Sequence, residues 1–425
     1  MTQYPLNPAR TIAELKELRA LTGDAEGAQR VAWTDTWAKA RAWMREKLSE
    51  LPVEIETDQA GNVWATLRGE SEKAVLIGGH IDSVPNGGWL DGCLDVLAGL
   101  EVLRRIAAEG TPPVTVRLVD WADEEGARFG RSLVGSSAFS GTMDPEDLAE
   151  LEDRDGVALP DALRAHGVDL FTAKMASAQQ KNAAAYLELH IEQGPVLESM
   201  GLPLGVVLGT FGVERHKITW RGQAAHSGST PMDKRRDALA GAAKLALYIR
   251  EIAREVGDGA VCTSGGVVCK PGIVTSVVET AEQLLDQRHL EPQKLATMLE
   301  MAKTASQRFA EEENITVEWE RLWHIHPIPF DAKLIELADV AIRETCGTVH
   351  RLPSGPLHDA AETARAGIPT VMLFVQSLRG ISHNKIEDTL EEHLVLSVEA
   401  LDRLASKTMI WVLQNAKIDE YSHKS

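Results

Sequence analysis

The amino-acid sequence predicts an α/β fold with a second domain inserted into it. Two apolar stretches, AVLIGGHID and PPVTVRLVDW, read as buried strands, and a helical stripe, LDVLAGLEVLRRIAAEG, lies between them. Strand, helix and strand in succession are typical of α/β domains, and a continuous apolar run is typical of a strand covered on both faces. A chain of 425 residues exceeds what one hydrophobic core usually holds, so we expect two domains.

The elements of the first domain follow in order along the chain. Apolar residues at helical spacing predict two helices between Thr11 and about Leu51, with a Gly-rich break at residues 23–27. A turn at residues 60–62 precedes the first buried strand. After the second buried strand, a polar, broken stretch runs from residue 143 to 182, and AAYLELHIEQGP then predicts a third strand.

The pattern changes between residues 212 and 326. Here the segments KITWRG and TSGGVVCKPG alternate with two helical patterns, RRDALAGAAKLALYIREIAREV and LATMLEMAKTASQRFAEEE, which indicates an α+β domain. The chain resumes with the helix DAKLIELADVAIRETCG, the strand TVMLFV, the loop GISHNKIE and a helix from Glu391 to about Asn415. The predicted domains are therefore a discontinuous one, residues 1–211 and 327–425, and an inserted one, residues 212–326.

Charge and composition argue against several classes of partner. Lys and Arg number 44 against 63 Asp and Glu, a net charge of −19 that repels nucleic acid and anionic lipid. The chain has no signal-peptide pattern and no apolar run of about 18 residues, which a membrane span needs. The four cysteines form no C-x-x-C pair, as is typical of a reducing compartment. We expect a cytoplasmic protein that binds neither nucleic acid nor membrane.

Polar residues stand at the end of the first buried strand. His80 and Asp82 share one face there, because strand side chains alternate with period two. A carboxylate that holds one imidazole nitrogen leaves the other free to bind a metal, so Asp82 can orient His80. Taken alone, the pair is also compatible with a simple polar strand end.

Other strand ends carry similar residues. Asp91 lies in the Gly-rich loop GGWLDG, which can turn a carboxylate back over the strand end, where it could bridge two cations. Glu124 and Glu125 end the second strand, and adjacent carboxylates repel unless a cation or proton intervenes. His190 ends the third strand and His383 follows the fourth. Sites of open α/β sheets lie beyond the carboxyl ends of the strands, so these side chains should meet.

The candidate ligands offer imidazole nitrogen and carboxylate oxygen: His80, Asp91, Glu125, His190 and His383. Such a set suits two divalent ions such as zinc, cobalt, nickel or manganese. Structural zinc sites are more often Cys-rich and closed, whereas sites of His and carboxylate leave room for water and substrate. A catalytic centre is therefore favoured, and Cys93 is expected to fill a small apolar position rather than to bind metal.

The chain resembles a known family through six motifs that occur in this order: GGHIDSVPNGGWLDG, DWADEEGARFG, LELHIEQGPVLE, QAAHSGSTPMDKRRDAL, SGPLHDA and GISHNKIEDT. Together they are similar to the amidase and carbamoylase branch of the dinuclear zinc peptidase family M20, over residues 10 to 415. The branch includes N-carbamoyl-L-amino acid hydrolases, β-ureidopropionases and allantoate amidohydrolases. The resemblance implies a mixed-sheet hydrolase domain that holds two metal ions, with an inserted α+β lid and dimerisation domain.

The resemblance also implies a role for each ligand. One ion would be held by His80, Asp91 and His190, and the other by Asp91, Glu125 and His383. Glu124 would be the general base, taking a proton from a water polarised by both ions as that water attacks a carbonyl carbon, and later protonating the leaving nitrogen. Asp82 would orient the His80 imidazole without binding the metal itself.

Three further residues match family positions that contact the substrate. His226 matches a histidine that reaches the active site from the partner subunit and stabilises the oxyanion, which implies a homodimer; its spacing alone suggests an ordinary loop residue. Gln193 and Arg288 match substrate-binding positions, and the planar guanidinium of Arg288 suits a carboxylate. A surface ion pair of Arg288 with Asp286 or Glu291 is the alternative.

Three positions depart from the family pattern near the substrate. Asp95 and Leu357 stand where the family has glycine, and both add bulk. The segment Thr275-Ser276-Val277-Val278 replaces Asn-Val-Ile-Pro, so a hydroxyl stands where relatives have an amide with both donor and acceptor groups. We therefore expect a changed pocket to which Thr275 and Leu357 contribute.

The predicted function is a homodimeric, metal-dependent amidohydrolase that cleaves a linear amide or ureido C–N bond in a small molecule. An N-carbamoyl-L-amino acid is the best match, and allantoate, 3-ureidopropionate and N-acyl amino acids are alternatives; peptides are less favoured. A catalytically silent relative that only binds ligand is the hypothesis from another class. Gly209, Gly212 and residues 327–329 flank the inserted domain and are expected to serve as hinges for its closure.

Overall fold

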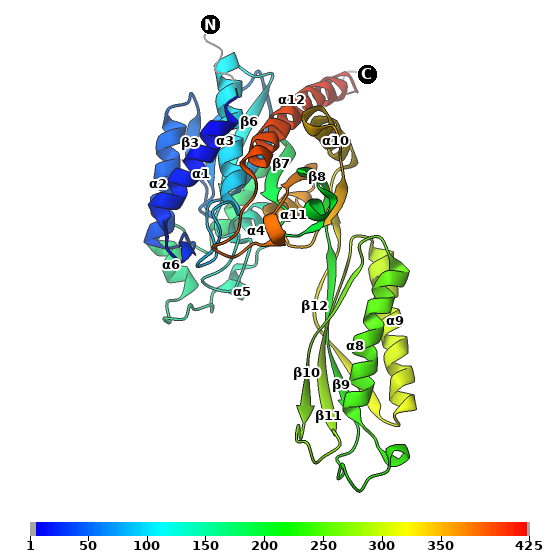
Figure 1. The fold of residues 1–425 in the computed structure, drawn as a ribbon. Coiled ribbons are helices and arrows are strands. Elements are labelled where there is room, and N and C mark those ends of the chain that lie inside the picture. Colours follow the sequence, from blue (N-terminus) through cyan, green and yellow to red (C-terminus); the bar gives the residue numbers. More distant parts are fainter. Residues whose placement is uncertain (1–5, 423–425) are drawn as a thin grey trace. The chain divides into compact units, whose positions relative to one another are not determined.

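The structure is a computed structural model that describes residues 6–422. It divides into two compact units (Figure 1). Unit 1 combines the residues up to Leu208 with those from Phe330 onward, and unit 2 comprises Gly209–Pro329. The predicted insertion, 212–326, lies within unit 2 and is shorter by three residues at each end.

Unit 1 is built on a mixed sheet with the strand order β8-β15-β7-β5-β6-β4-β3, and β14 pairs with β8. The central pairs β15–β7, β7–β5 and β5–β6 are parallel, whereas β3–β4, β4–β6 and β8–β15 are antiparallel. The predicted α/β fold with a mixed sheet is therefore confirmed. The strands are β3 (Glu54–Thr57), β4 (Val63–Leu67), β5 (Ser71–His80), β6 (Val114–Trp121), β7 (Ala183–Ile191), β8 (Leu204–Thr210), β14 (Arg351–Ser354) and β15 (Thr370–Val375), beside a small ribbon of β1 (Gly23–Asp24) and β2 (Gly27–Ala28).

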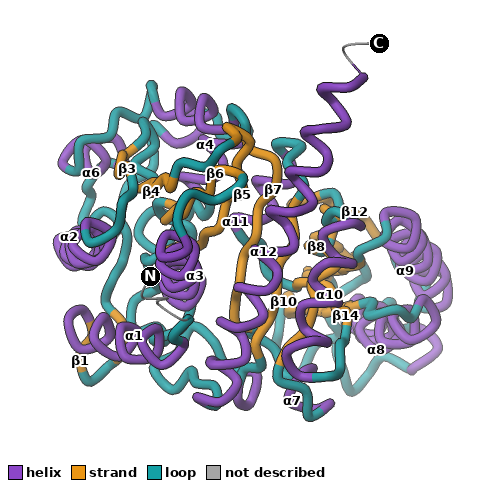
Figure 2. The backbone as a smooth tube through the Cα atoms, turned by 90° about the horizontal axis from the view of Figure 1, so that it is seen from above, coloured by secondary structure: helices purple, strands orange, loops and turns teal. Residues whose placement is uncertain are grey.

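Helices cover the sheet of unit 1. α3 and α12 contact each other and lie over β5, β6 and β7, as Figure 2 shows, while α11 packs on β7 and β15. The central strands are buried because both of their faces carry apolar side chains, as their continuous apolar runs predict. The helices are α1 (Pro8–Thr22), α2 (Asp35–Ser49), α3 (Cys93–Glu109), α4 (Val134–Ser140), α5 (Pro145–Leu148), α6 (Leu159–Ala165), η1 (Ala173–Gln180), α7 (Val196–Met200), α10 (Ala332–Cys346), α11 (Asp359–Arg365), η3 (Leu378–Gly380) and α12 (Glu391–Ser422).

Unit 2 is a four-stranded antiparallel sheet with two long helices, and it is coloured from green to yellow in Figure 1. Its strand order is β10-β11-β9-β12, and its core joins the sheet to α8 and α9. The elements are β9 (Gly212–Arg221), η2 (Met232–Lys234), α8 (Ala238–Val256), β10 (Val261–Lys270), β11 (Thr280–His289), α9 (Pro292–Glu312), β12 (Thr316–Ile325) and β13 (Ile328–Pro329).

Some elements were not anticipated. No strand was predicted at β8 or β14, and no helix was predicted at α11. The last helix extends beyond the predicted end near residue 415, to Ser422. Within residues 6–422, no helix is both long and apolar enough to cross a membrane.

Candidate metal centre

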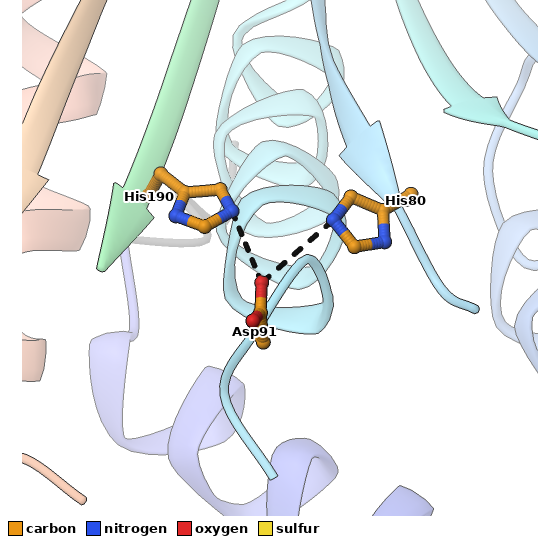
Figure 3. Close-up of side chains that lie close together, drawn as sticks. All are labelled: His80, Asp91 and His190. Atoms are coloured by element: carbon orange, nitrogen blue, oxygen red, sulfur yellow. Dashed lines mark ion pairs between the residues drawn. The ribbon is translucent and has the colours of Figure 1, made fainter. Parts of the chain in front are cut away.

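The carboxyl ends of the parallel strands bring the candidate ligands together. His80 is the last residue of β5 and His190 is the penultimate residue of β7. Glu124 and Glu125 follow β6, and Asp91 precedes α3 in the loop after β5. Figure 3 shows the two imidazoles approaching Asp91 from the two strand ends. The sheet thus gathers at one edge the side chains that the sequence placed at separate strand ends.

The first ligand set is deeply buried. The Nε2 atom of His190 lies 3.2 Å from Oδ1 of Asp91, and Nε2 of His80 lies 3.8 Å from the same oxygen. Ligand atoms of a tetrahedral zinc ion, each about 2.0–2.1 Å from the metal, are about 3.3 Å apart. The spacing of His80, Asp91 and His190 therefore suits one metal ion among them.

The second ligand set shares Asp91 and is open to solvent. Nε2 of His383 lies 3.4 Å from Oδ2 of Asp91 and 3.3 Å from Oε2 of Glu125. The His383 side chain is 51% exposed, whereas those of Asp91 and Glu125 are buried. Asp91 thus turns one oxygen toward each ligand set, which is the arrangement of a carboxylate that bridges two cations.

Backbone carbonyls orient two of the imidazoles. Nδ1 of His80 lies 3.0 Å from the carbonyl oxygen of Asp82, and Nδ1 of His190 lies 2.8 Å from that of Ile191. A carbonyl oxygen only accepts, so each Nδ1 donates and each Nε2 faces Asp91, ready to bind a metal once it carries no proton. Among the described residues, Nε2 of His80 has no hydrogen-bond partner. A cation between these groups would satisfy them.

Asp82 acts differently from the sequence expectation. Its carboxylate does not hold the His80 ring: Oδ1 lies 3.7 Å from Nδ1, and the backbone carbonyl of Asp82 accepts the ring N–H instead. The chain leaves the strand after His80, which turns this carbonyl toward the ring. The Asp82 carboxylate then accepts the backbone N–H groups of Glu124 and Glu125, each at 3.2 Å. Asp82 therefore links the loops that follow β5 and β6.

Glu124 lies at the border of the ligand sets. Its Oε2 atom is 3.7 Å from Nε2 of His80, and its side chain is buried. Burial and the neighbouring charge of Glu125 raise the pKa of Glu124 well above its ordinary value. A carboxylate with a raised pKa is a stronger proton acceptor, which is what a general base requires.

The imidazoles and carboxylates of this centre shift one another's pKa values. Burial lowers the pKa of His80 to about 4, whereas contact with Asp91 raises that of His383 to about 9. Burial also opposes protonation of His190, but the charges of Asp95 and Asp91 raise the pKa of His190 well above its ordinary value. The pKa of Asp91 lies well below normal, since its imidazole partners outweigh burial. Protons on His190 and His383 therefore balance the charge of the Asp91 carboxylate where a cation would otherwise do so.

Gln193 contacts the bridging carboxylate. Its Nε2 donates to Oδ2 of Asp91 at 2.9 Å and to Oγ of Ser382 at 3.0 Å. Its Oε1 is buried and has no hydrogen-bond partner in the described part of the chain. The predicted substrate residue thus lies beside the ligands, with one acceptor unused.

Asp95 and Leu357, the two bulky departures, also lie in unit 1. Asp95 is buried in the first turn of α3, where burial raises the pKa of its carboxyl group well above normal. An ideal Cβ on Gly79 would lie 2.3 Å from that of Asp95, so the aspartate fills the space that this glycine of β5 leaves. Leu357 is half-buried and directly precedes His358 at the start of α11.

His226 and Thr275 lie on adjacent loops of unit 2. His226 is exposed, and its Nδ1 accepts the backbone N–H groups of Gly228 and Ser229 at 3.2 Å. Ser227 N–H donates to the Thr275 carbonyl at 2.9 Å, which joins the two loops. Because Nδ1 accepts, Nε2 carries the proton and is a hydrogen-bond donor.

Arg288 forms the ion pair that the sequence offered as the alternative. Its Nε lies 2.8 Å from Oδ1 of Asp286, and its Nη2 lies 3.2 Å from the other carboxylate oxygen. Asp286 also pairs with Arg215 at 2.8 Å. All three residues belong to unit 2, so this unit alone forms the ion-pair cluster.

Two further polar residues, His358 and Glu387, lie at the centre and were not among the predicted site residues. His358 is 2% exposed, and its ring centroid lies 4.3 Å from that of His190. Glu387 accepts the backbone N–H groups of Leu90 and Asp91, each at 3.1 Å, and so holds the loop that carries the bridging carboxylate. Both residues belong to motifs already noted, SGPLHDA and GISHNKIEDT. Their polar side chains within these motifs were the feature of the sequence that could have identified them as site residues.

Comparison with known proteins finds relatives along nearly the whole chain. An N-carbamoyl-L-amino acid amidohydrolase of Geobacillus stearothermophilus is 36% identical over 380 residues, which cover 88% of this chain and 92% of that protein. An allantoate amidohydrolase of Escherichia coli is 32% identical over 381 residues, 89% of this chain and 92% of the relative. A solved amidase of the hydantoinase/carbamoylase family from Burkholderia multivorans has a TM-score of 0.85 at 29% identity, covering 94% of this chain and 98% of its own.

These relatives confirm the predicted branch and the predicted enzyme class, a hydrolase of C–N bonds other than peptide bonds. The model of peptidase family M20/M25/M40 matches residues 76–407, a span that includes every candidate ligand. The chain therefore belongs to peptidase family M20/M25/M40.

Proposed function

We propose that the protein hydrolyses a linear amide or ureido C–N bond at a centre of two divalent ions. The observation that carries the proposal is the position of Asp91, whose two oxygens face two separate ligand sets. Zinc, manganese, cobalt and nickel all suit this mixture of nitrogen and oxygen ligands. When bound, such ions polarise the substrate carbonyl and lower the pKa of water.

Glu124 is the proposed general base. It accepts a proton from the attacking water at a carboxylate oxygen and then donates that proton to the leaving nitrogen. Its burial beside His80 keeps it within reach of the ligands, and its raised pKa fits a group that must both take and release a proton. Asp82 supports this step by fixing the backbone N–H groups of Glu124 and Glu125.

The best proposed substrate is an N-carbamoyl-L-amino acid, which would give the free amino acid, carbon dioxide and ammonia. The relative from Geobacillus, which is named for this substrate, supports the choice. Allantoate, 3-ureidopropionate and N-acyl amino acids are the alternatives, and the relative from Escherichia coli supports the first of these.

Four residues are the proposed substrate contacts: Gln193, Thr275, Arg288 and Leu357. Gln193 offers its unused amide oxygen beside Asp91, and Leu357 would narrow the pocket. Arg288 would exchange Asp286 for the substrate carboxylate, while Arg215 keeps the charge of Asp286 balanced. Thr275 would contribute a hydroxyl group in place of an amide.

Unit 2 is the proposed lid and dimerisation domain. In a homodimer, His226 would donate its Nε2–H to the oxyanion of the partner's substrate, which agrees with the acceptor role of its Nδ1.

The proposed location is the cytoplasm. The four cysteines are free thiols, which supports a cytoplasmic location.

The test measures ammonia release by metal-loaded protein from N-carbamoyl-L-amino acids, allantoate and 3-ureidopropionate, and acid release from N-acyl amino acids. Glu124→Gln should lower kcat by about a thousandfold while both ions are retained, since general bases contribute about 10²–10⁴-fold. Glu70→Gln, which makes the same change at an exposed position, is the matched control. Turnover by Glu124→Gln at the wild-type rate would refute the base assignment. Binding without turnover of any of these compounds would instead favour a silent relative.

A further inference from the structure

A segment outside the metal centre touches both loops that carry its ligands. This segment, which we call the connector, comprises residues 28–34 between α1 and α2. It contacts the loop that follows β5 and the loop that follows β6. The connector contains none of the residues proposed to bind metal, transfer protons or contact substrate.

Arg30 attaches the connector to the first loop. Its backbone N–H donates to Oγ of Ser83 at 3.1 Å, and the Ser83 N–H donates back to the Arg30 carbonyl at 3.1 Å. The fully buried guanidinium donates through Nε to the carbonyl of Ile81 at 2.9 Å. These bonds hold the residues on either side of Asp82.

Trp33 attaches the connector to the second loop. Its indole Nε1–H donates to Oδ2 of Asp123 at 2.7 Å, and both residues are only 1% exposed. Asp123 directly precedes Glu124 in the chain. Arg128, from the same loop, donates a guanidinium N–H to the Trp33 carbonyl. The loop that carries Glu124 and Glu125 is thus bonded to Trp33 at two points.

The backbone on both sides of this hydrogen bond is strained. Trp33 has φ of 62° and Asp123 has φ of 58°, in the left-handed region that non-glycine residues rarely adopt. Such conformations persist only where surrounding contacts determine them, and they gather at functional sites. The indole–carboxylate bond joins the two strained residues directly.

Packing alone does not explain the hydrogen bond. Trp37 lies in the same aromatic cluster, with its ring centroid 4.8 Å from that of Trp33, and it is also buried. Its indole N–H, however, has no hydrogen-bond partner among residues 6–422. The two tryptophans therefore share their packing and differ in one bond to the ligand loop.

We propose that Trp33 is a positioning residue for the hydrolysis, acting through Asp123 on Glu124 and Glu125. The inference rests on the proposed roles of these two glutamates. Loss of the indole N–H frees Asp123 to leave the left-handed conformation, which moves Glu125 relative to His383. Misplacement of a reacting group by about 1 Å costs about 10²-fold in rate, so even a smaller shift would be measurable.

The experiment compares Trp33→Phe with Trp37→Phe, because each keeps a buried ring and removes one indole N–H. We expect kcat of Trp33→Phe to fall about tenfold or more with KM within about twofold, and kcat of Trp37→Phe to stay within about twofold of wild type. Co²⁺ titration of the ion-free proteins gives a readout that needs no turnover. One of two Co²⁺ ions should bind more weakly to Trp33→Phe only.

A second pair of variants keeps the test decisive if Trp33→Phe does not fold. Asp123→Asn retains an oxygen acceptor for the indole, whereas Asp123→Gly removes it, and both residues tolerate a positive φ. Asp123→Asn should keep kcat and Co²⁺ affinity near the wild-type values. Asp123→Gly should have a lower kcat and a lower affinity for one Co²⁺ ion, as Trp33→Phe does.

Equal kcat and equal Co²⁺ affinity for the two Trp variants would overturn the inference, as would equal behaviour of the two Asp123 variants. Failure of the wild type on every substrate would count against the proposed function instead. The Co²⁺ comparison would still decide the role of Trp33 in that case.

Discussion

Gly92 offers a sharp test of the metal centre, because it stands between Asp91 and α3 with φ of +65°. An ideal Cβ at this position would lie 2.4 Å from Nδ1, Cε1 and the carbonyl oxygen of His80. Ordinary contacts between non-bonded carbon atoms are about 3.5–4.0 Å. Gly92→Ala therefore requires the backbone at position 92 and His80 to separate by about 1 Å, which displaces the neighbouring Asp91 from His80.

Two effects set the size of the loss. A left-handed alanine costs about 1–2 kcal/mol of folding stability. The larger effect falls on metal binding, since a ligand shift of about 1 Å far exceeds the tolerance of about 0.2 Å in metal–ligand distances. We expect affinity for the ion at His80, Asp91 and His190 to fall about 100-fold, or about 2.8 kcal/mol.

Gly201→Ala separates the two effects. Gly201 also has φ of +65°, but no atom lies within 4 Å of its ideal Cβ. Zinc titration against a competing chelator measures the affinity, and thermal unfolding of the ion-free proteins measures the stability. Gly201→Ala should bind both ions as the wild type does. If Gly92→Ala does the same, the described proximity of Gly92 to His80 is wrong.

Three further predictions concern the ions and the scaffold. His383→Ala should retain one ion per chain by elemental analysis, because only one of the two sets contains this histidine; two retained ions would contradict the assignment. Contact with Asp91 raises the pKa of His383 to about 9, so below that pH metal uptake must displace its proton. Affinity should therefore fall as pH falls from 9 to 6, with proton release visible by calorimetry in two buffers; a pH-independent affinity would be inconsistent. Arg41→Met leaves the buried Asp120 carboxylate without its partner at 2.7 Å and should lower the free energy of unfolding by about 3–5 kcal/mol in denaturant titration; a loss below about 1 kcal/mol would show that the pair is not needed.

The candidate ligands at strand ends could be predicted because apolar runs mark those strands in the sequence. His80, Glu125 and His190 stand at or just after apolar runs, and parallel strands bring their carboxyl ends to one edge of the sheet. That information is local to each segment. The α/β class followed from the same runs.

Contacts across long sequence separations could not be predicted in this way. The Asp82 carboxylate was expected to hold the ring of His80, two residues away, but its hydrogen bond comes from the backbone N–H of Glu124, 42 residues away. Glu387 lies 297 residues from Leu90, and Trp33 lies 90 residues from Asp123. No periodicity or spacing in the sequence links such pairs, because they form only when the loops meet in the folded chain.

The unequal exposure of the two ligand sets has a consequence for the kinetics of metal exchange. An ion bound beside the half-exposed His383 would be able to lose this ligand to water, whereas the buried His80 and His190 would not be released in this way. We call the site at Asp91, Glu125 and His383 the outer position and the site at His80, Asp91 and His190 the inner position. Chelators should therefore remove an ion from the outer position first and leave a protein with one ion. The outer position would also sample whichever transition metal is abundant, so preparations that differ only in growth medium would differ in composition there and agree at the inner one.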